Sequence, residues 1–243
     1  MKSILLSQAH DPMGTAIADY LHHGKAQKLR VFSSMFDEDE IPVEELFRSF
    51  NEMPPLEQEA LRLAQGKILD VGAGSGCHAL ELKRMNKEVF PIDISPLSVQ
   101  TMRERGLDTA LLVNLYDPDF KQTFDTILLL MNGSGIIGKL DNMPMFFNRM
   151  KTLLNPGGCI YMDSSDLRYL YEDEDGSFTI DLAANYYGEV DFQMQYQHIK
   201  GEPFDWLYVD FETLSHYAEQ NGFKAQLVKE GKHYDYLARL TRK

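Results

Sequence analysis

The chain has 243 residues, of which 44% are hydrophobic and 25% are charged; this balance fits one α/β domain with additional segments and excludes wholesale disorder. Its formal net charge of −13 disfavours DNA and RNA as partners, because such binding depends on Lys and Arg contacts to phosphates. Two cysteines cannot form a disulfide framework, and no apolar run is long enough for a signal peptide or a membrane span, so we expect a cytoplasmic chain with no membrane partner.

The first 66 residues are predicted to form a helical region that lies over the main domain as a lid. Apolar residues recur at helical spacing across residues 13–36, and an acidic run followed by proline then marks a turn. Further helices are expected over residues 43–50 and 56–64. The main domain is therefore predicted to span residues 67–243.

From Lys67 onward, short apolar runs alternate with helical segments. Strands are expected at residues 67–71, 88–94, 109–114, 124–131 and 158–163, and helices at residues 76–87, 96–105 and 141–154. Ser95 followed by Pro96 is a well-formed helix start, because serine caps the helix and proline suits its first position. This alternation is typical of an α/β fold with a doubly wound, mostly parallel sheet.

The simple alternation stops after Asp163, and an insertion is expected at about residues 166–211. It holds an acidic loop at residues 172–176 and two alternating segments, 190–198 and 206–211, which we interpret as an antiparallel hairpin. A helix at residues 213–220 and a closing hairpin of residues 223–229 and 234–241 complete a seven-stranded sheet.

The stretch of residues 67–76, KILDVGAGSG, is the most informative motif in the chain. Gly72, Gly74 and Gly76 allow positive φ and close approach of the backbone to a ligand, and the helix that follows offers its free N–H groups. The spacing is G-x-G-x-G, whereas the dinucleotide pattern G-x-G-x-x-G would need a glycine at Cys77. The turn is therefore predicted to bind a nucleoside cofactor, and its spacing disfavours a nicotinamide dinucleotide.

A second carboxylate, Asp93, ends the next predicted strand, 17 positions after Gly76 (93 − 76). That interval holds one helix and one strand of a βαβ unit, so Asp93 is expected beside the glycine turn. There it can accept hydrogen bonds from ribose hydroxyls.

An acidic residue, Asp70, before G-x-G-x-G and a second, Asp93, at the end of the next strand resemble the first two motifs of the class I S-adenosylmethionine-dependent methyltransferases. The resemblance covers residues 56–165 best and implies a Rossmann-like methyltransferase fold with S-adenosyl-L-methionine as the cofactor. It implies that Asp70 lies near the methionine ammonium and that Asp93 holds the ribose diol. The cofactor-binding residues that it implies are Asp70, Gly72, Ala73, Gly74, Gly76, Asp93, Ile94, Asn114, Leu115, Leu130, Met131 and Asn132.

Within this set the resemblance implies that Asn114 and Leu115 touch the adenine, and Asp117 is an alternative candidate for that contact. It also implies that residues 130–132 line the methionyl end of the cofactor. Asn132 could orient an acceptor hydroxyl or amine, but it lacks the Asn-Pro-Pro-Tyr context of methyltransferases that act on nucleic-acid bases or glutamine. Such acceptors are therefore disfavoured.

Residues that could bind the methyl acceptor are Tyr20, Asn132, Asp163 and Arg168. The polar stretch of residues 163–169 could bind a polar acceptor, supply a base or hold a metal, or it could merely cap a helix and form an ion pair. No catalytic base and no metal site are assigned. Arg48 could reach the cofactor carboxylate or form a surface salt bridge, and the aromatic residues around Trp206 could form a pocket for a flat molecule or pack against a sheet.

The predicted function is methyl transfer from S-adenosylmethionine to a small, neutral or cationic acceptor. Displacement at a sulfonium depends mainly on positioning, so the lack of an obvious nucleophile does not oppose it. The alternatives are an NAD(P)-dependent oxidoreductase and a non-catalytic module that binds the cofactor. The sequence leaves the acceptor atom and the oligomeric state open.

Overall fold

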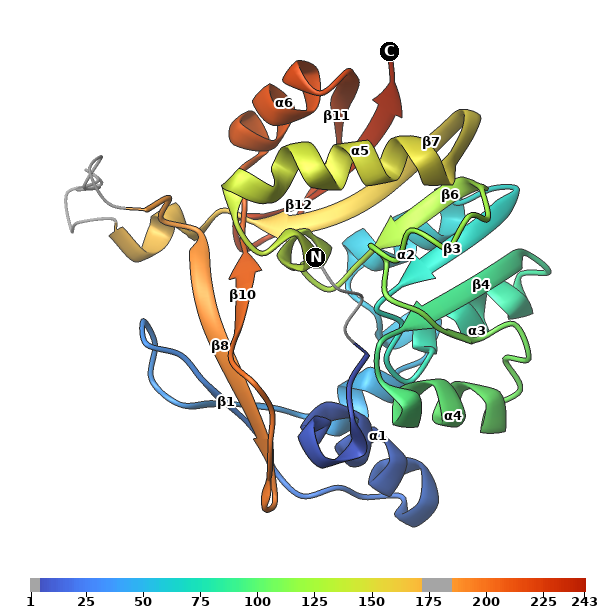
Figure 1. Cartoon of the computed structure of the whole chain (residues 1–243), viewed down its shortest axis with the longest axis vertical. Coiled ribbons are helices and arrows are strands. Elements are labelled where there is room, and N and C mark those ends of the chain that lie inside the picture. Colours follow the sequence, from blue (N-terminus) through green and yellow to red (C-terminus); the bar gives the residue numbers. More distant parts are fainter. Residues whose placement is uncertain (1–4, 172–184) are drawn as a thin grey trace.

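The computed structural model describes residues 5–171 and 185–243, and a seven-stranded sheet lies at its centre (Figure 1). In spatial order its strands are β11 (Phe223–Glu230), β12 (Asp235–Arg242), β7 (Leu154–Ser165), β6 (Phe124–Leu129), β3 (Lys67–Val71), β4 (Glu88–Asp93) and β5 (Leu111–Leu112). The five strands from β7 to β5 are parallel, whereas β12 runs antiparallel to both of its neighbours. The predicted seven-stranded, mostly parallel sheet is thereby confirmed.

Helices cover both faces of this sheet (Figure 1). One layer consists of α2 (Pro55–Leu63), α3 (Cys77–Arg84) and α4 (Pro96–Glu104), and the other of α5 (Met143–Leu153) and α6 (Phe211–Gln220). Phe146 and Phe147 of α5 are completely buried, and each such side chain stabilises the fold by about 1.5–3 kcal/mol. The Ser95 hydroxyl accepts a hydrogen bond from the Ser98 N–H at 2.9 Å, so α4 begins at the predicted cap.

A second, antiparallel sheet lies beside the carboxyl edge of the parallel strands (Figure 1). In spatial order it contains β10 (Phe204–Leu207), β8 (Glu189–Tyr196), β1 (Leu29–Phe32) and β2 (Asp39–Ile41), and β9 (Ile199–Lys200) pairs with β8. The hairpin expected in the insertion is present as β8 and β10. It is not isolated, because β8 also pairs with β1 from the beginning of the chain.

The expectation of helix across residues 13–36 was wrong beyond its first half. The helix α1 (Pro12–His23) ends at Gly24, which has φ of +67°, and the chain then forms β1 and β2. Residues 43–50 were also expected to be α-helical, and they form short 3-10 turns, η2 (Val43–Phe47) and the start of η3 (Phe50–Glu52). The helical pattern is overridden because β8, which is distant in sequence, supplies hydrogen-bond partners to β1.

The remaining short elements connect the main ones. They are η1 (Gln8–His10), η4 (Gly133–Ile137), η5 (Leu140–Asn142) and η6 (Leu167–Tyr171). The strand expected at residues 109–114 is only the two-residue β5, and the acidic loop predicted at residues 172–176 lies outside the described residues. Across residues 5–171 and 185–243, the structure contains no helix with the length and apolar character needed to cross a bilayer.

Candidate active site

The glycine turn joins β3 to α3 at the carboxyl edge of the sheet. Gly72, Gly74 and Gly76 have φ of +69°, +56° and +82°, a region that side-chain-bearing residues rarely adopt. A Cβ atom at Gly76 would lie 2.6 Å from Leu107 Cδ1, so glycine is also needed there for packing against α4 and its following turn. A Cβ atom at Gly72 would meet no described atom within 4 Å, so the turn is open on that side.

Asp93 lies at the end of β4, directly beside this turn. Its carboxylate accepts hydrogen bonds from the Gly74 N–H at 2.9 Å and from the Ser95 N–H at 2.8 Å. Burial raises the pKa of Asp93 to about 6, although both N–H donors act in the opposite direction. The carboxylate is thus held in place by backbone groups from two loops before any ligand binds.

Asp70 is the last but one residue of β3, and its side chain is only 2% exposed. Its Oδ2 atom has no hydrogen-bond partner among the described residues. Burial raises the pKa of this carboxyl, while the nearby His78 opposes that shift. A buried acceptor without a partner is costly, so this oxygen is suited to receive a donor from a ligand.

A cluster of buried charges lies next to Asp70. The Arg48 Nη2 atom contacts both carboxylate oxygens of Glu57 at 2.5 Å, and the His78 Nε2 atom lies 2.7 Å from Glu57 Oε2. Although burial opposes a charged imidazole, the neighbouring Cys77, Glu57 and Asp70 raise the pKa of His78 to about 10. The ion pair between Arg48 and Glu57 does not lie at the surface, because the Arg48 side chain is only 9% exposed. The Nε atom of Arg48 has no hydrogen-bond partner among the described residues.

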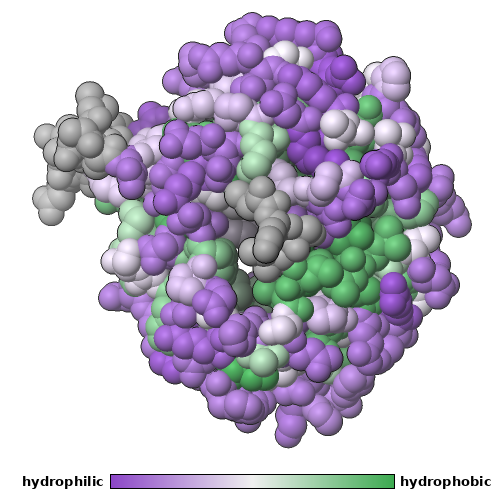
Figure 2. All heavy atoms as spheres, in the orientation of Figure 1, coloured by the Kyte–Doolittle hydropathy of each residue, from purple (hydrophilic) through white to green (hydrophobic). Residues whose placement is uncertain are grey.

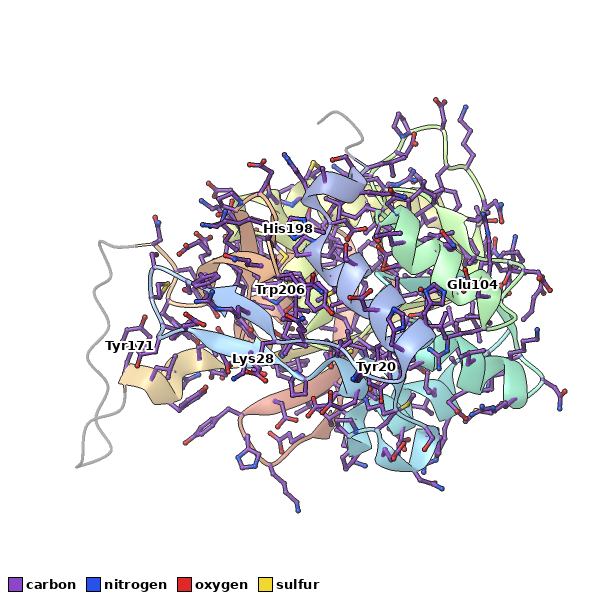
Figure 3. The ribbon with its side chains drawn as sticks, turned by 90° about the horizontal axis from the view of Figure 1, so that it is seen from below. Tyr20, Lys28, Glu104, Tyr171, His198 and Trp206 are labelled. Carbon is purple, nitrogen blue, oxygen red and sulfur yellow. The ribbon has the colours of Figure 1, made fainter. Side chains whose placement is uncertain are left out.

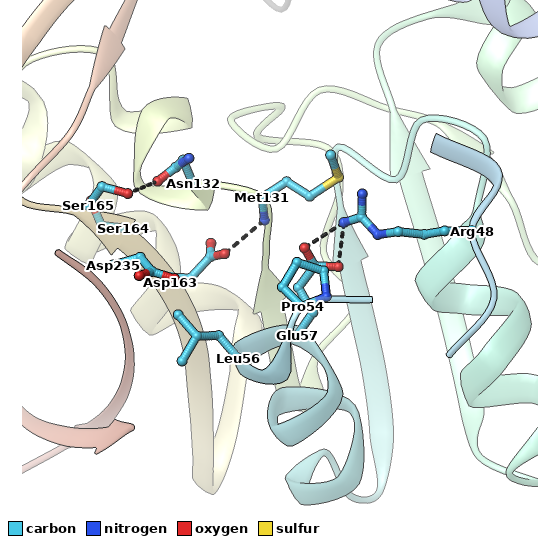
Figure 4. A pocket seen from close by; sticks show the side chains of 10 residues that line it. All are labelled: Arg48, Pro54, Leu56, Glu57, Met131, Asn132, Asp163, Ser164, Ser165 and Asp235. Atoms are coloured by element: carbon cyan, nitrogen blue, oxygen red, sulfur yellow. Dashed lines mark hydrogen bonds and ion pairs between the residues drawn. The ribbon is translucent and has the colours of Figure 1, made fainter. Parts of the chain in front are cut away.

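This cluster forms one wall of a pocket with a volume of about 250 Å³ (Figure 4). The lining residues are Arg48, Pro54, Leu56, Glu57, Met131, Asn132, Asp163, Ser164, Ser165 and Asp235. The pocket thus joins the loop before α2 to the loop after β6 and to the end of β7. On the face shown in Figure 2, the surface is hollowed between the β8 side and an apolar area that lies over β4.

The loop after β6 has an unusual backbone that Asp163 supports. Met131 and Asn132 have φ of +66° and +55°, and two such residues in succession are strained. The Asp163 carboxylate accepts hydrogen bonds from the Met131 N–H at 3.1 Å and the Gly133 N–H at 2.9 Å. Burial raises the pKa of Asp163 to about 6. The backbone of this loop therefore occupies both oxygens of Asp163.

The loop after β5 also reaches this edge. The Val113 N–H donates to the Asp93 carbonyl at 3.0 Å, and Asn114 Oδ1 accepts from the Tyr116 N–H at 2.9 Å. The Leu115 side chain is 3% exposed and packs in the core.

The candidate acceptor residues are only partly brought together. Asn132 and Asp163 both line the pocket, and Asn132 Oδ1 accepts a hydrogen bond from the Ser165 hydroxyl at 2.8 Å. Tyr20 does not line it; its ring packs on Phe47 with centroids 4.6 Å apart. Arg168 also lies outside the lining and pairs with Asp166 at 2.9 Å.

The N-terminal segment lies against the same edge. The Leu6 N–H donates to the carbonyl of Ile94 at 2.9 Å, and the Ser95 hydroxyl donates to Asp11 Oδ2 at 2.5 Å. Ile17 Cδ1 lies 3.8 Å from the position of a Cβ atom at Gly74. Sequence reasoning did not identify Asp11, Glu57 or His78, although a histidine in the first helical turn after a glycine motif is a usable signal.

Comparisons with known proteins agree with this geometry. A methyltransferase domain family model matches residues 68–158. A solved structure of an S-adenosylmethionine-dependent methyltransferase from Bacteroides fragilis, in complex with S-adenosyl-L-homocysteine, is 66% identical, has a TM-score of 0.95 and covers 100% of this chain and 99% of its own. No curated protein matches the chain.

Two more distant structures share the fold alone. The CcbJ methyltransferase from Streptomyces caelestis is 17% identical with a TM-score of 0.62, and the match covers 97% of this chain and 99% of that chain. The PH0226 protein from Pyrococcus horikoshii OT3 is 18% identical with a TM-score of 0.54, and the match covers 78% and 88%.

The 66% sequence identity to the Bacteroides fragilis methyltransferase extends over the whole chain. Such a high identity indicates a shared family and not only a shared fold. The glycine turn is open at Gly72, and the Asp93 carboxylate adjoins it. The alternative of a nicotinamide-dependent oxidoreductase is therefore set aside. The chain belongs to the S-adenosylmethionine-dependent methyltransferases, and S-adenosylmethionine is its methyl donor.

Proposed function

We propose that this methyltransferase acts on a small-molecule acceptor. The supporting observation is that the carboxyl edge faces other parts of the same chain, namely the N-terminal segment through Leu6 and Asp11 and the second sheet through β10. A bulky macromolecule would have to displace these contacts. The net charge of −13 further disfavours a nucleic-acid acceptor.

The residues at the edge fit the adenosyl part of the cofactor. Asp93 is fixed beside the open turn at Gly72, and an ionised carboxylate there can accept hydrogen bonds from two ribose hydroxyls. Ala73, Gly74 and Gly76 complete the turn, and Ile94, Asn114 and Leu115 are proposed to surround the adenine. When bound, the cofactor supplies a methyl group that is activated by the positive charge on its sulfur.

Two buried atoms suit the amino-acid end of the cofactor. Asp70 Oδ2 is an acceptor and Arg48 Nε is a donor, and neither has a hydrogen-bond partner among the described residues. The amino-acid end carries one ammonium and one carboxylate, so its two charged groups match these two atoms in kind. We therefore assign Asp70 to the ammonium and Arg48 to the carboxylate, with Leu130, Met131 and Asn132 along the methionyl chain.

The chain's own contribution to the reaction is positioning. Asp163 holds the strained loop at Met131 and Asn132, and that loop fixes one side of the place where donor and acceptor meet. Holding two reactants in line supplies a large part of the acceleration in such a displacement. With both oxygens engaged by backbone N–H groups, Asp163 is better suited to this role than to acting as a base.

Two measurements test the proposal. Calorimetry with S-adenosylhomocysteine is expected to show binding, and its absence at millimolar ligand would contradict the cofactor assignment. S-adenosylmethionine with a labelled methyl group, incubated with fractionated small metabolites, proteins or nucleic acids, is expected to label the metabolite fraction. Label that appears only in macromolecules would contradict the small-molecule acceptor, and tight binding without any transfer would favour a cofactor-binding role.

A further inference from the structure

The second sheet has two chemically different faces, because side chains alternate along each strand. In strands β1, β8 and β10, all four charged residues, Arg30, Glu189, Asp191 and Asp205, share the outer face. The edge strand β2 differs, because its exposed Asp39 pairs with Val31 and lies on the inner face. The registers that pair Val31 with Met194 and Phe204 with Phe192 put apolar side chains on the opposite, inner face. Within these three strands the inner face thus carries no charge.

The inner face is covered at one end only. Leu29 and Tyr196 are 0% and 1% exposed because they pack against Ala16 and Ile17 of α1. Farther along the same face, Phe192, Phe204 and Trp206 remain partly exposed. The sheet therefore presents aromatic side chains that no described element covers completely.

These side chains form what we call the aromatic strip, made of Phe192, Phe204, Trp206 and Tyr208. The ring centroids of Phe204 are 6.2 Å from Phe192 and 6.0 Å from Trp206, and those of Phe192 and Tyr208 are 6.4 Å apart. The interplanar angles lie between 53° and 78°, so neighbouring rings are tilted or meet edge to face rather than stacked, and each of these side chains remains partly exposed.

The aromatic strip begins at the active edge. The indole of Trp206 lies so close to Gly135 that any Cβ atom there would overlap the ring. Gly135 belongs to η4, which directly follows Asn132, and the Gly135 N–H donates to the Asn132 carbonyl at 2.9 Å. In the view of Figure 3, Trp206 lies near the middle of the molecule's outline, and its side chain is partly buried. The strip therefore continues from the loop that adjoins the site of methyl transfer.

We propose that the methyl acceptor is a planar aromatic molecule without net charge, and that its ring binds against the aromatic strip. This inference rests on the proposed function. An uncharged ring loses little on leaving water and gains from edge and face contacts, whereas an anionic acceptor would lack a positively charged partner on the inner face of β1, β8 and β10. A cationic acceptor could contact the ring faces, so the test below includes a cation. The three acids that line the adjoining pocket already have partners. Asp163 accepts from backbone N–H groups, Glu57 contacts Arg48 and His78, and Asp235 accepts from the His233 N–H.

The single tryptophan of the chain makes a direct test possible, because all tryptophan emission comes from Trp206. The protein loaded with S-adenosylhomocysteine is titrated with p-nitroaniline, a planar and uncharged molecule that absorbs tryptophan emission. Saturable quenching is expected, and choline and cyclohexanol should not produce it. Quenching that never saturates, or binding of choline in preference to p-nitroaniline, would overturn the proposal.

Matched variants locate the binding. Phe192→Ala and Phe204→Ala are each expected to weaken p-nitroaniline binding by about fivefold, the order of one aromatic contact. Phe32→Ala is the control, because Phe32 pairs with Gln193 on the outer face of the same sheet and lies beneath Arg30. Equal affinity in the Phe192, Phe204 and Phe32 variants would contradict a site on the inner face.

Transfer of a labelled methyl group separates this inference from the proposed function. Phenols and anilines are expected to accept the label, with a raised KM in Phe192→Ala and unchanged calorimetric affinity for S-adenosylhomocysteine. If aliphatic metabolites are labelled and aromatic ones are not, the acceptor class is wrong and the small-molecule function stands. If S-adenosylhomocysteine does not bind, both fail.

Discussion

Asp11 and Ser95 join the first turns of two helices at the active edge. Asp11 Oδ1 accepts a hydrogen bond from the Gly14 N–H at 2.8 Å and thereby caps α1, while its Oδ2 accepts from the Ser95 hydroxyl. That hydroxyl in turn caps α4 by accepting from Ser98. Because Ser95 also donates its N–H to Asp93, the N-terminal helix is connected to the proposed ribose site through one serine.

Replacing Asp11 with alanine should therefore loosen the N-terminal segment as well as α1. Loss of a helix cap costs about 1–2 kcal/mol, and the buried Ser95 hydroxyl would lose its acceptor. We expect a lower melting temperature and faster proteolysis near α1, both partly restored by S-adenosylhomocysteine. Ser7→Ala is the control, since Ser7 precedes η1 without a capping side-chain hydrogen bond. An Asp11→Ala protein as stable as the Ser7 variant would contradict the connection.

Asp93→Asn should weaken binding of S-adenosylhomocysteine by about tenfold or more, because hydrogen bonds to an ionised group contribute about 1.5–3 kcal/mol. The fold should survive, since the amide oxygen still accepts one backbone N–H. Calorimetry measures the affinity, with Asp119→Asn in an exposed turn as the control. Unchanged affinity in the Asp93 variant would contradict the proposal that this carboxylate binds the ribose hydroxyls.

The pKa of Asp93 also predicts how cofactor affinity depends on pH. Burial raises that pKa to about 6, and the carboxylate must be ionised to accept from both ribose hydroxyls. Affinity of the wild-type protein for S-adenosylhomocysteine should therefore fall as the pH drops through about 6. The Asp93→Asn variant should lose most of this dependence when both proteins are titrated between pH 5 and pH 8. The same pH dependence of affinity in both proteins would show that a group other than Asp93 causes it.

Arg48→Met tests the proposed contact with the amino-acid end of the cofactor. The change keeps an apolar stem and removes the guanidinium, so affinity for S-adenosylhomocysteine should fall by about tenfold, the order of a charge-assisted hydrogen bond. Binding of 5′-methylthioadenosine, which lacks the amino-acid end, should change little. The ratio of the two affinities is informative even if the variant is less stable. Arg62→Met, at an exposed position of α2, is the control. Equal losses for both ligands would contradict the assignment.

The raised pKa of the His78 imidazole predicts that the protein loses stability at alkaline pH. Its pKa is raised to about 10 in the folded protein from the ordinary 6.5, so the folded state binds the proton more tightly than the unfolded state does. The stabilisation is complete below pH 6.5 and is lost as the pH rises toward 10. Urea unfolding at pH 7, 8.5 and 10 should show this decline in the wild-type protein and a shallower decline in His78→Gln. Identical slopes would show that the imidazole is not charged in the folded protein.

Much of the fold was predictable because its signals are local. The glycine turn, the Ser95-Pro96 helix start and the apolar runs of β3 and β6 each lie within a few residues of sequence. The seven-stranded sheet follows from their order. The helix expected up to residue 36 is replaced by β1 from Leu29, because strand formation there depends on the pairing of Leu29 with Tyr196, which a local pattern cannot reveal.

In the candidate site, too, the features with local sequence signals were predictable and those that depend on distant contacts were not. The sequence places Asp70, the glycines and Asp93 at one edge, and the structure brings them together there. It does not reveal that Arg48 is buried against Glu57 and His78, because three separate segments meet to form that cluster. Nor does it distinguish Asp163 as a support for a strained loop from Asp163 as a ligand. Which of these residues touch the cofactor stays a prediction.

The second sheet shares no strand with the seven-stranded sheet, and its inner face carries the aromatic strip. If the acceptor binds there as we propose, acceptor choice and donor use are encoded in different parts of the chain. Substitutions at Phe192 or Phe204 offer a route by which evolution or an engineer could redirect this catalyst toward new compounds, with the machinery around Asp93 left intact.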